Sequence, residues 1–109
     1  MPESFERGAL TEAVFYIMLS LHRPMHGYAM MQNIESITGG RVTLGPGTLY
    51  GAINALVQKG WIAAVSGGGD SRKKEYTITD AGKTVFLAEM ERLRELIGNG
   101  ESIIKGVQS

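Results

Sequence analysis

The sequence predicts a small α+β domain that is mostly helical, on three observations. In four segments apolar residues recur every three to four positions, which is typical of helices buried on one side. Two short segments, residues 61–66 and 73–79, predict strands, and in the second Tyr76 and Ile78 alternate with polar residues. The chain has 109 residues, enough for one domain with a thin core that a partner subunit would help to complete.

The first predicted helix starts near Thr11, which is a favourable N-cap, and ends before Pro24. One face carries apolar residues at spacings of four, three and four: Leu10, Val14, Ile17 and Leu21. Further apolar side chains fill the other faces: Phe15, Tyr16, Met18 and Leu19. A helix that is apolar nearly all round is usually covered on more than one side, and we expect a second subunit to supply part of that cover.

The second and third predicted helices flank a short turn that contains glycine. The second spans about residues 26–38, with Met30, Ile34 and Ile37 inward, and stops at Gly39 and Gly40. The third opens at Gly45-Pro46 and ends at Gly60, as favoured at the two ends of a helix. Its inner stripe is Leu49, Ile53, Leu56 and Val57. Its opposite side is small and uncharged: Gly47, Gly51, Asn54 and Gln58, with Thr48 and Tyr50 on the shoulders.

The two predicted strands are joined by a glycine-rich tip, Gly67-Gly68-Gly69, which Arg72, Lys73 and Lys74 follow. The last helix starts at Thr79 or Asp80, and Asp80 is well placed at its positive end. Phe86, Met90, Leu93 and Ile97 repeat like a coiled-coil seam. Gly98, Asn99 and Gly100 weaken the helix, so whether it continues beyond them stays open.

This order of elements predicts a winged helix-turn-helix. The apolar seam of the long C-terminal helix predicts that this helix is used for dimerisation. Residues 1–79 would form the DNA-binding domain, with the hairpin as its wing. Residues 80–109 would form the dimerisation helix, and the two parts would make one compact unit.

Charge is balanced over the chain but unevenly placed. Lys plus Arg and Asp plus Glu are both 11, while residues 41–79 carry a net charge of plus three. There is no cysteine, which excludes disulfides and thiolate metal sites and fits a reducing compartment. The acidic N-terminus does not resemble a signal peptide, and no apolar run is long enough to span a membrane. We therefore expect a cytoplasmic protein.

Three enzyme or metal signatures fail on particular residues. Gly40 to Gly45 has the spacing of a phosphate-binding loop, but Pro46 stands where lysine is required. Gly45, Gly47 and Gly51 miss the dinucleotide-binding spacing by one residue. Pro24 prevents the helix that would align His22 and His26 on a metal. The sequence therefore predicts no enzyme, no cofactor and no metal.

Several motifs together resemble the PadR family of bacterial transcriptional regulators. They are Pro46-Gly47-Thr48-Leu49-Tyr50 with Ile53 and Leu56, then Gly60-Trp61-Ile62, His26-Gly27-Tyr28, and the run from Arg72 to Thr79 with Gly82. The resemblance implies a dimeric winged-helix repressor of the compact subgroup, whose single terminal helix makes the dimer. Some compact members bind aromatic, drug-like molecules between their subunits. This chain differs from those in having no tryptophan in its last helix, since its only one is Trp61.

The predicted partner is double-stranded DNA with a pseudo-palindromic operator. We expect base or phosphate contacts from the third helix, with Asn54 suited to adenine, and phosphate contacts from the second helix and the wing. The predicted DNA-binding residues are Tyr28, Gly47, Thr48, Tyr50, Gly51, Asn54, Arg72, Lys73 and Lys74. Alternatively, Tyr28 and Tyr50 belong partly to the core, Asn54 is an idle surface amide, and the basic run is merely solvated.

A homodimer seam is expected along the first and last helices, at Leu10, Val14, Ile17, Phe86, Met90, Leu93 and Ile97. A candidate pocket for an apolar or aromatic effector comprises Phe15, Met18, Phe86 and Met90. Two other functions stay open at this point. One is a winged-helix module that binds only proteins, which net neutrality and the lack of basic residues on the third helix favour somewhat. The other is a small-molecule carrier built at the dimer seam.

Overall fold

The computed structural model describes residues 9–66 and 74–108 of the chain. The elements follow in the order α2 (Glu12–Ser20), β1 (Met25–His26), α3 (Gly27–Ile37), α4 (Pro46–Lys59), β2 (Ile62–Ser66), β3 (Glu75–Ile78) and α5 (Asp80–Gln108). The predicted helices and strands are all present within a residue or two of their expected bounds. The predicted glycine-rich tip lies outside the described residues.

Local capping explains where the short helices begin and end. The Thr11 hydroxyl accepts a hydrogen bond from the Val14 N–H at 3.2 Å, which caps α2 as expected. The N-cap of α3 is His26, whose ring Nδ1 accepts a hydrogen bond from the Ala29 N–H at 3.2 Å. At the end of α4, Gly60 takes a positive φ of 80°, a conformation that costs glycine little.

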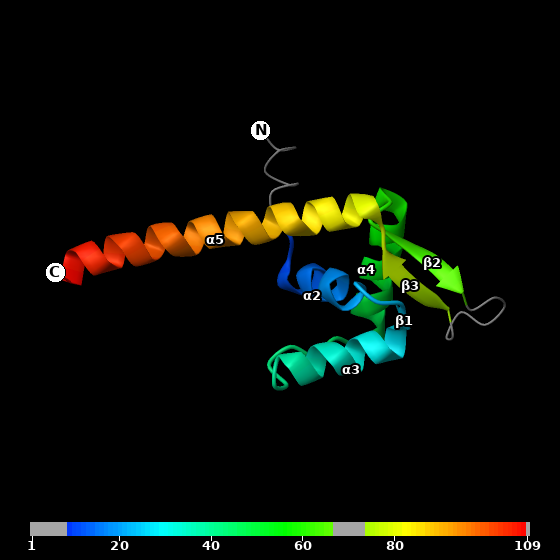
Figure 1. The fold of residues 1–109 in the computed structure, drawn as a ribbon. Helices are drawn as coiled ribbons and strands as arrows, with labels where there is room; N and C mark the ends of the chain where they lie inside the picture. Colours follow the sequence, from blue (N-terminus) through cyan, green and yellow to red (C-terminus); the bar gives the residue numbers. More distant parts are fainter. Residues whose placement is uncertain (1–8, 67–73, 109) are drawn as a thin grey trace.

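A three-stranded antiparallel sheet, in the order β1-β3-β2, lies at one end of the molecule (Figure 1). Met25 pairs with Tyr76, and Ile62 pairs with Ile78. The carbonyl of Leu21, just after α2, accepts from the Ile78 N–H at 2.8 Å and from the Thr77 hydroxyl at 3.2 Å. Strand β1 was not predicted, because two residues are too few to show an alternating pattern.

The core lies between the helices and the sheet. Its fully or almost fully buried members are Ile17, Met18, Leu21, Met30, Ile34, Leu49, Ile53, Leu56, Ile62, Tyr76, Ile78 and Phe86. Two residues predicted for inner stripes are instead exposed. Ile37, 50% exposed, is the last residue of α3, where the chain turns away through Gly39 and Gly40. Val57, 41% exposed, lies about 100° round the helix from Leu56, outside the narrow arc of α4 that meets the core.

Helix α5 is one continuous helix through Gly98 and Gly100, which answers the question left open by the sequence. It crosses the start of β2 closely, since a Cβ at Gly82 would lie 2.1 Å from the Trp61 carbonyl oxygen. Beyond the domain it extends past α2 and α3 as an arm (Figure 1), and the molecule measures 61 × 33 × 22 Å. Within residues 9–66 and 74–108, no helix is both long and apolar enough to cross a membrane.

Candidate nucleic-acid interface

Helix α4 has one side in the core and one side in solvent. Leu49, Ile53 and Leu56 are buried. The outer face of α4, defined as Gly47, Thr48, Gly51, Asn54 and Gln58, is exposed at every position. A Cβ at Gly47 or Gly51 would meet no atom within 4 Å, so the helix backbone is open to close approach. The prediction that this face is bare is therefore confirmed.

The first turn of α4 leaves backbone donors available. The helix begins with Gly45 as N-cap and Pro46 in its first turn, and no side chain caps it. Proline has no N–H to satisfy, and the next N–H groups point outward along the positive end of the helix dipole. Such a turn suits a phosphate oxygen.

The two tyrosines predicted to contact DNA lie in different environments. Tyr28, near the start of α3, is 60% exposed. Tyr50 is half-buried, and its ring crosses to the first residue of α3. A Cβ at Gly27 would lie 2.3 Å from the Tyr50 hydroxyl oxygen and 2.7 Å from Cζ, so a side chain there would require the Tyr50 ring to shift. Tyr50 thus holds α4 against α3, a contact that the sequence did not reveal.

The hairpin of β2 and β3 projects at the end of the molecule opposite to the α5 arm (Figure 1). Lys74, directly before β3, is half-exposed. The other two basic residues predicted for the wing, Arg72 and Lys73, lie outside the described residues. The predicted DNA-binding residues that the structure describes as accessible are Tyr28, Gly47, Thr48, Gly51, Asn54 and Lys74.

Comparison with known proteins assigns the family. Residues 16–88, which include α3, α4 and the hairpin segment, match the family described as "Transcriptional regulator PadR-like family". The chain belongs to this family. Its members are described as transcriptional regulators.

Solved structures share this PadR-like fold. A PadR family transcriptional regulator from Eggerthella lenta is 25% identical, with a TM-score of 0.68 over 95% of this chain and 88% of that one. A transcriptional regulator from Clostridium thermocellum is also 25% identical, with a TM-score of 0.63 over 89% and 97% of the two chains. A PadR-like transcription factor from Bacteroides fragilis, 21% identical, supports the fold with a TM-score of 0.71 over 94% and 96%.

A curated relative extends the similarity to a longer protein. An uncharacterized 37.1 kDa protein in transposon TN4556 of Streptomyces fradiae is 36% identical over 75 residues. These residues are 69% of the PadR-like chain but only 21% of that protein.

The residues predicted for the dimer seam divide into buried and accessible ones. Ile17 and Phe86 are buried in the core of the single PadR-like chain and have no surface to offer a partner, which corrects the prediction. The reason is that α5 packs on α2, where the Phe86 ring lies 4.7 Å from the ring of Phe15. The remaining members stay accessible: Leu10, Val14, Met90 and Leu93 are half-buried, and Ile97 is exposed.

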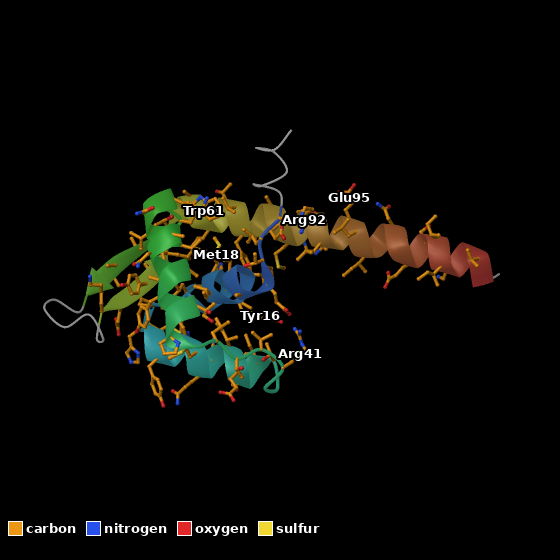
Figure 2. All side chains as sticks on the ribbon, turned by 180° about the vertical axis from the view of Figure 1, so that it is seen from behind. Tyr16, Met18, Arg41, Trp61, Arg92 and Glu95 are labelled. Carbon is orange, nitrogen blue, oxygen red and sulfur yellow. The ribbon has the colours of Figure 1, made fainter. Side chains whose placement is uncertain are left out.

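The predicted effector pocket is also corrected. Met18 and Phe86 are buried, and in Figure 2 Met18 points into the space between the helices. A cavity of about 350 Å³ opens beside them instead, and of the predicted residues only Phe15 lines it. Its lining is Leu10, Glu12, Phe15, Tyr16, Glu89, Arg92 and Leu93.

An ion pair at this cavity was missed by the sequence reasoning. Glu89 is only 4% exposed and accepts from Arg92 Nε and Nη2 at 2.8 and 2.7 Å and from the Leu10 N–H at 3.1 Å. The hydrogen bonds from Arg92 lower the pKa of the Glu89 carboxyl below its usual value. The spacing of three residues within one helix was the available signal. Glu12, which also lines the cavity, pairs with Arg41, and Figure 2 shows Arg41 beside Tyr16.

The described residues bring together no group of three His, Cys, Asp or Glu side chains. His22 and His26 serve the backbone instead. His22 Nδ1 lies 3.0 Å from the Met18 carbonyl oxygen at the end of α2, and His26 caps α3.

Proposed function

We propose that this PadR-like protein is a homodimeric repressor that binds a pseudo-palindromic operator and is released by a small apolar or aromatic effector. The assignment of the DNA-binding surface rests on one observation. The outer face of α4 is exposed and uncharged, and nothing lies within 4 Å of a Cβ at either of its two glycines. A helix that merely faced water would more often carry charged pairs. Small side chains allow the helix to come close to the base edges in the DNA major groove, and amide side chains can form hydrogen bonds to those edges.

The residues have separable tasks in this proposal. Gly47 and Gly51 let the backbone of α4 approach the major groove, and Asn54 makes paired hydrogen bonds to an adenine edge. Thr48 and the first turn of α4 bind phosphate. Tyr28 adds a phosphate contact from α3, and Lys74 does so from the wing together with Arg72 and Lys73. Tyr50 acts by positioning α4.

A dimer is supported by the far part of α5. Past Leu93 this helix leaves the domain, yet its apolar residues continue and are exposed: Leu96, Ile97, Ile103, Ile104 and Val107. An apolar stripe of this length is stable when a partner covers it. Two copies would then place two α4 helices in successive major grooves, roughly 34 Å apart.

The effector is proposed to enter the cavity lined by Phe15, Tyr16 and Leu93, beside the accessible part of the seam. Aromatic and aliphatic walls, whose charged members are the Glu89–Arg92 pair and Glu12, favour a planar molecule that is mostly apolar. An effector that fits one dimer geometry better than another would shift the spacing of the two α4 helices and so release the operator.

Selection of bound duplexes from a random DNA pool tests this function, followed by affinity measurements across a salt series. We expect an inverted repeat with half-sites about one turn apart and a steep loss of affinity with salt. A pool that yields no enriched sequence, or binding that salt does not change, would contradict the proposal. It would favour a winged-helix module that binds only proteins.

A further inference from the structure

A cavity of about 340 Å³ lies where the end of α2 meets α3, separate from the cavity beside Phe15. Its lining is Leu19, Ser20, His22, Arg23, Met25 and Asn33. Most of the lining surface is polar, yet it contains no aspartate or glutamate. No residue of α4 or α5 belongs to it, so the cavity is also distinct from the proposed DNA-binding face.

The turn after α2 brings an arginine without a partner to this cavity. The described part of the chain contains four arginines, and three of them pair with a glutamate: Arg41, Arg92 and Arg94. The fourth, Arg23, is exposed and forms no ion pair within the described residues. A guanidinium can bind the two oxygens of a carboxylate or phosphate at once. In a cavity without acidic side chains, Arg23 is therefore available to an anion.

His22 contributes one ring nitrogen to the same cavity. Its Nδ1 lies 3.0 Å from the Met18 carbonyl oxygen and 3.2 Å from that of Leu19. Because carbonyl oxygens only accept hydrogen bonds, Nδ1 carries the proton, and Nε2 of the neutral ring is an acceptor for a ligand hydroxyl. The ring of Phe86 lies 5.0 Å from the His22 ring, centre to centre, which helps to fix its orientation.

A buried hydrogen bond fixes a second donor on the wall. Ser20 is only 4% exposed, and its Oγ accepts from Asn33 Nδ2 at 2.9 Å. This bond joins α2 to α3, which pack against each other (Figure 1), and orients the amide group. An amide NH₂ has two N–H donors, so the second one remains for an oxygen of a ligand.

We propose that this cavity binds a small aliphatic hydroxy acid. The carboxylate lies on Arg23 and receives a further hydrogen bond from the Asn33 amide. The hydroxyl of the ligand donates to Nε2 of His22. A short alkyl chain packs on Leu19 and Met25, the two apolar members of the lining.

The cavity is connected to two other parts of the molecule. Met25 belongs to β1 and pairs with Tyr76 of β3, which is a strand of the hairpin. His22 contacts Phe86 near the start of α5. A ligand in the cavity would therefore touch one residue that is bonded to the hairpin sheet and one that packs on α5.

Nuclear magnetic resonance titration of the full chain, labelled with ¹⁵N, tests the proposal with 2-hydroxybutyrate as the probe. We expect saturable shifts of the backbone amides of residues 19–25 and of the Asn33 side-chain amide. Butyrate, which lacks the hydroxyl, should bind roughly threefold to tenfold more weakly. The cation 1-amino-2-butanol keeps the hydroxyl and the alkyl chain but should cause no saturable shift, because it cannot bind Arg23.

A matched pair of arginine variants locates the site. Arg23→Gln should weaken the binding of 2-hydroxybutyrate at least about tenfold, since it removes the charged donor. Arg94→Gln removes an equally exposed arginine from α5 and should leave the affinity unchanged. Both side chains are exposed, so both variants should keep the fold, which the unshifted amide spectrum of the remaining residues checks.

Several results would overturn the proposal. They are the absence of saturable shifts up to about 50 mM probe, equal binding of the cation, or equal effects of the two arginine variants. Tighter binding of inorganic phosphate than of 2-hydroxybutyrate would refute a hydroxy acid as the ligand class. Equal affinities for butyrate and 2-hydroxybutyrate would refute the hydrogen bond to His22. The proposed DNA binding does not depend on any of these results, because no residue of α4 lines the cavity.

Discussion

The outer face of α4 and the far half of α5 are both exposed, yet they differ in the chemistry that they present. The α4 face is made of glycine, threonine and amide side chains, while the α5 arm presents leucine, isoleucine and valine. A polar, uncharged surface is stable in water and can form hydrogen bonds with another polar surface. A long apolar stripe is stable only when another surface covers it. The difference is consistent with the two kinds of partner that we propose, DNA for α4 and a second copy of the chain for α5.

The largest expected effect comes from placing a charge in the α5 stripe. Ile104→Asp should lower the dimerisation constant more than about 100-fold, because an unpaired carboxylate would be buried at the seam. Ile104 is exposed in the single chain, so the helix content by circular dichroism should not change. Sedimentation equilibrium measures the effect, with Ser102→Asp on the opposite face as control. A dimer of undiminished strength would show that the arm has another partner.

The contact between α3 and α4 is the next most sensitive point. Gly27→Ala should destabilise the fold by about 2 kcal/mol, since its methyl group would overlap the Tyr50 hydroxyl. Combining it with Tyr50→Ala should cost less than the sum of the two single changes, which urea denaturation can measure. Additive losses would mean that Tyr50 does not lock the two helices together. If it does, both single variants should also bind the selected duplex more weakly.

Asn54 tests the specificity of the α4 face. Asn54→Ala should cost about 1–3 kcal/mol at one base pair of the operator and leave the other positions unchanged. The change is at an exposed side chain, so stability should be unaffected. The effect is measured by comparing the DNA sequences selected by the wild-type protein with those selected by the variant. An identical preference would show that Asn54 does not determine the sequence that is bound. Asn99→Ala, which removes an exposed amide on α5 away from the outer face of α4, is the matched control.

The Glu89–Arg92 pair gives a pH dependence. Because the pKa of Glu89 is lowered in the folded state, the pair stabilises the protein above the ordinary carboxyl pKa and loses this effect as pH falls through the lowered value. Glu89→Gln should therefore cost about 1–2 kcal/mol at pH 7 and progressively less below pH 4. Thermal unfolding of both proteins from pH 7 to pH 3 checks this. A constant difference over that range would show that the carboxylate charge is not what stabilises this contact.

The smallest effect is expected from the wing. Lys74→Ala should weaken binding to every duplex alike and reduce the slope of log affinity against log salt by about one. Lys83→Ala, an exposed lysine in the first turn of α5, is a control for lost charge. A change confined to one sequence would mean that Lys74 reads bases instead of phosphate.

Sequence reasoning predicted the division of α4 into inner and outer faces because proline, glycine and a strict apolar period act locally. It could not predict where helices meet. Phe86 and Ile17 were expected at a subunit seam, but the packing of α5 on α2 buries them within one chain. The role of Tyr50 at Gly27, the short strand β1 and the Glu89–Arg92 pair likewise depend on tertiary contacts, and Val57 shows that an apolar period overstates the width of a buried face.

The most direct test of the account is the affinity of Gly51→Glu for the selected operator, measured beside Gly98→Glu. Both glycines are helical, exposed and free of neighbours within 4 Å, so both variants should fold and be at least as stable as the parent. A carboxylate at position 51 would face the phosphates and groove that α4 is proposed to enter, and we expect affinity to fall at least about 100-fold, or ~2.7 kcal/mol. The variant at position 98 should bind normally. Equal binding by the two variants would contradict the claim that the outer face of α4 docks on DNA.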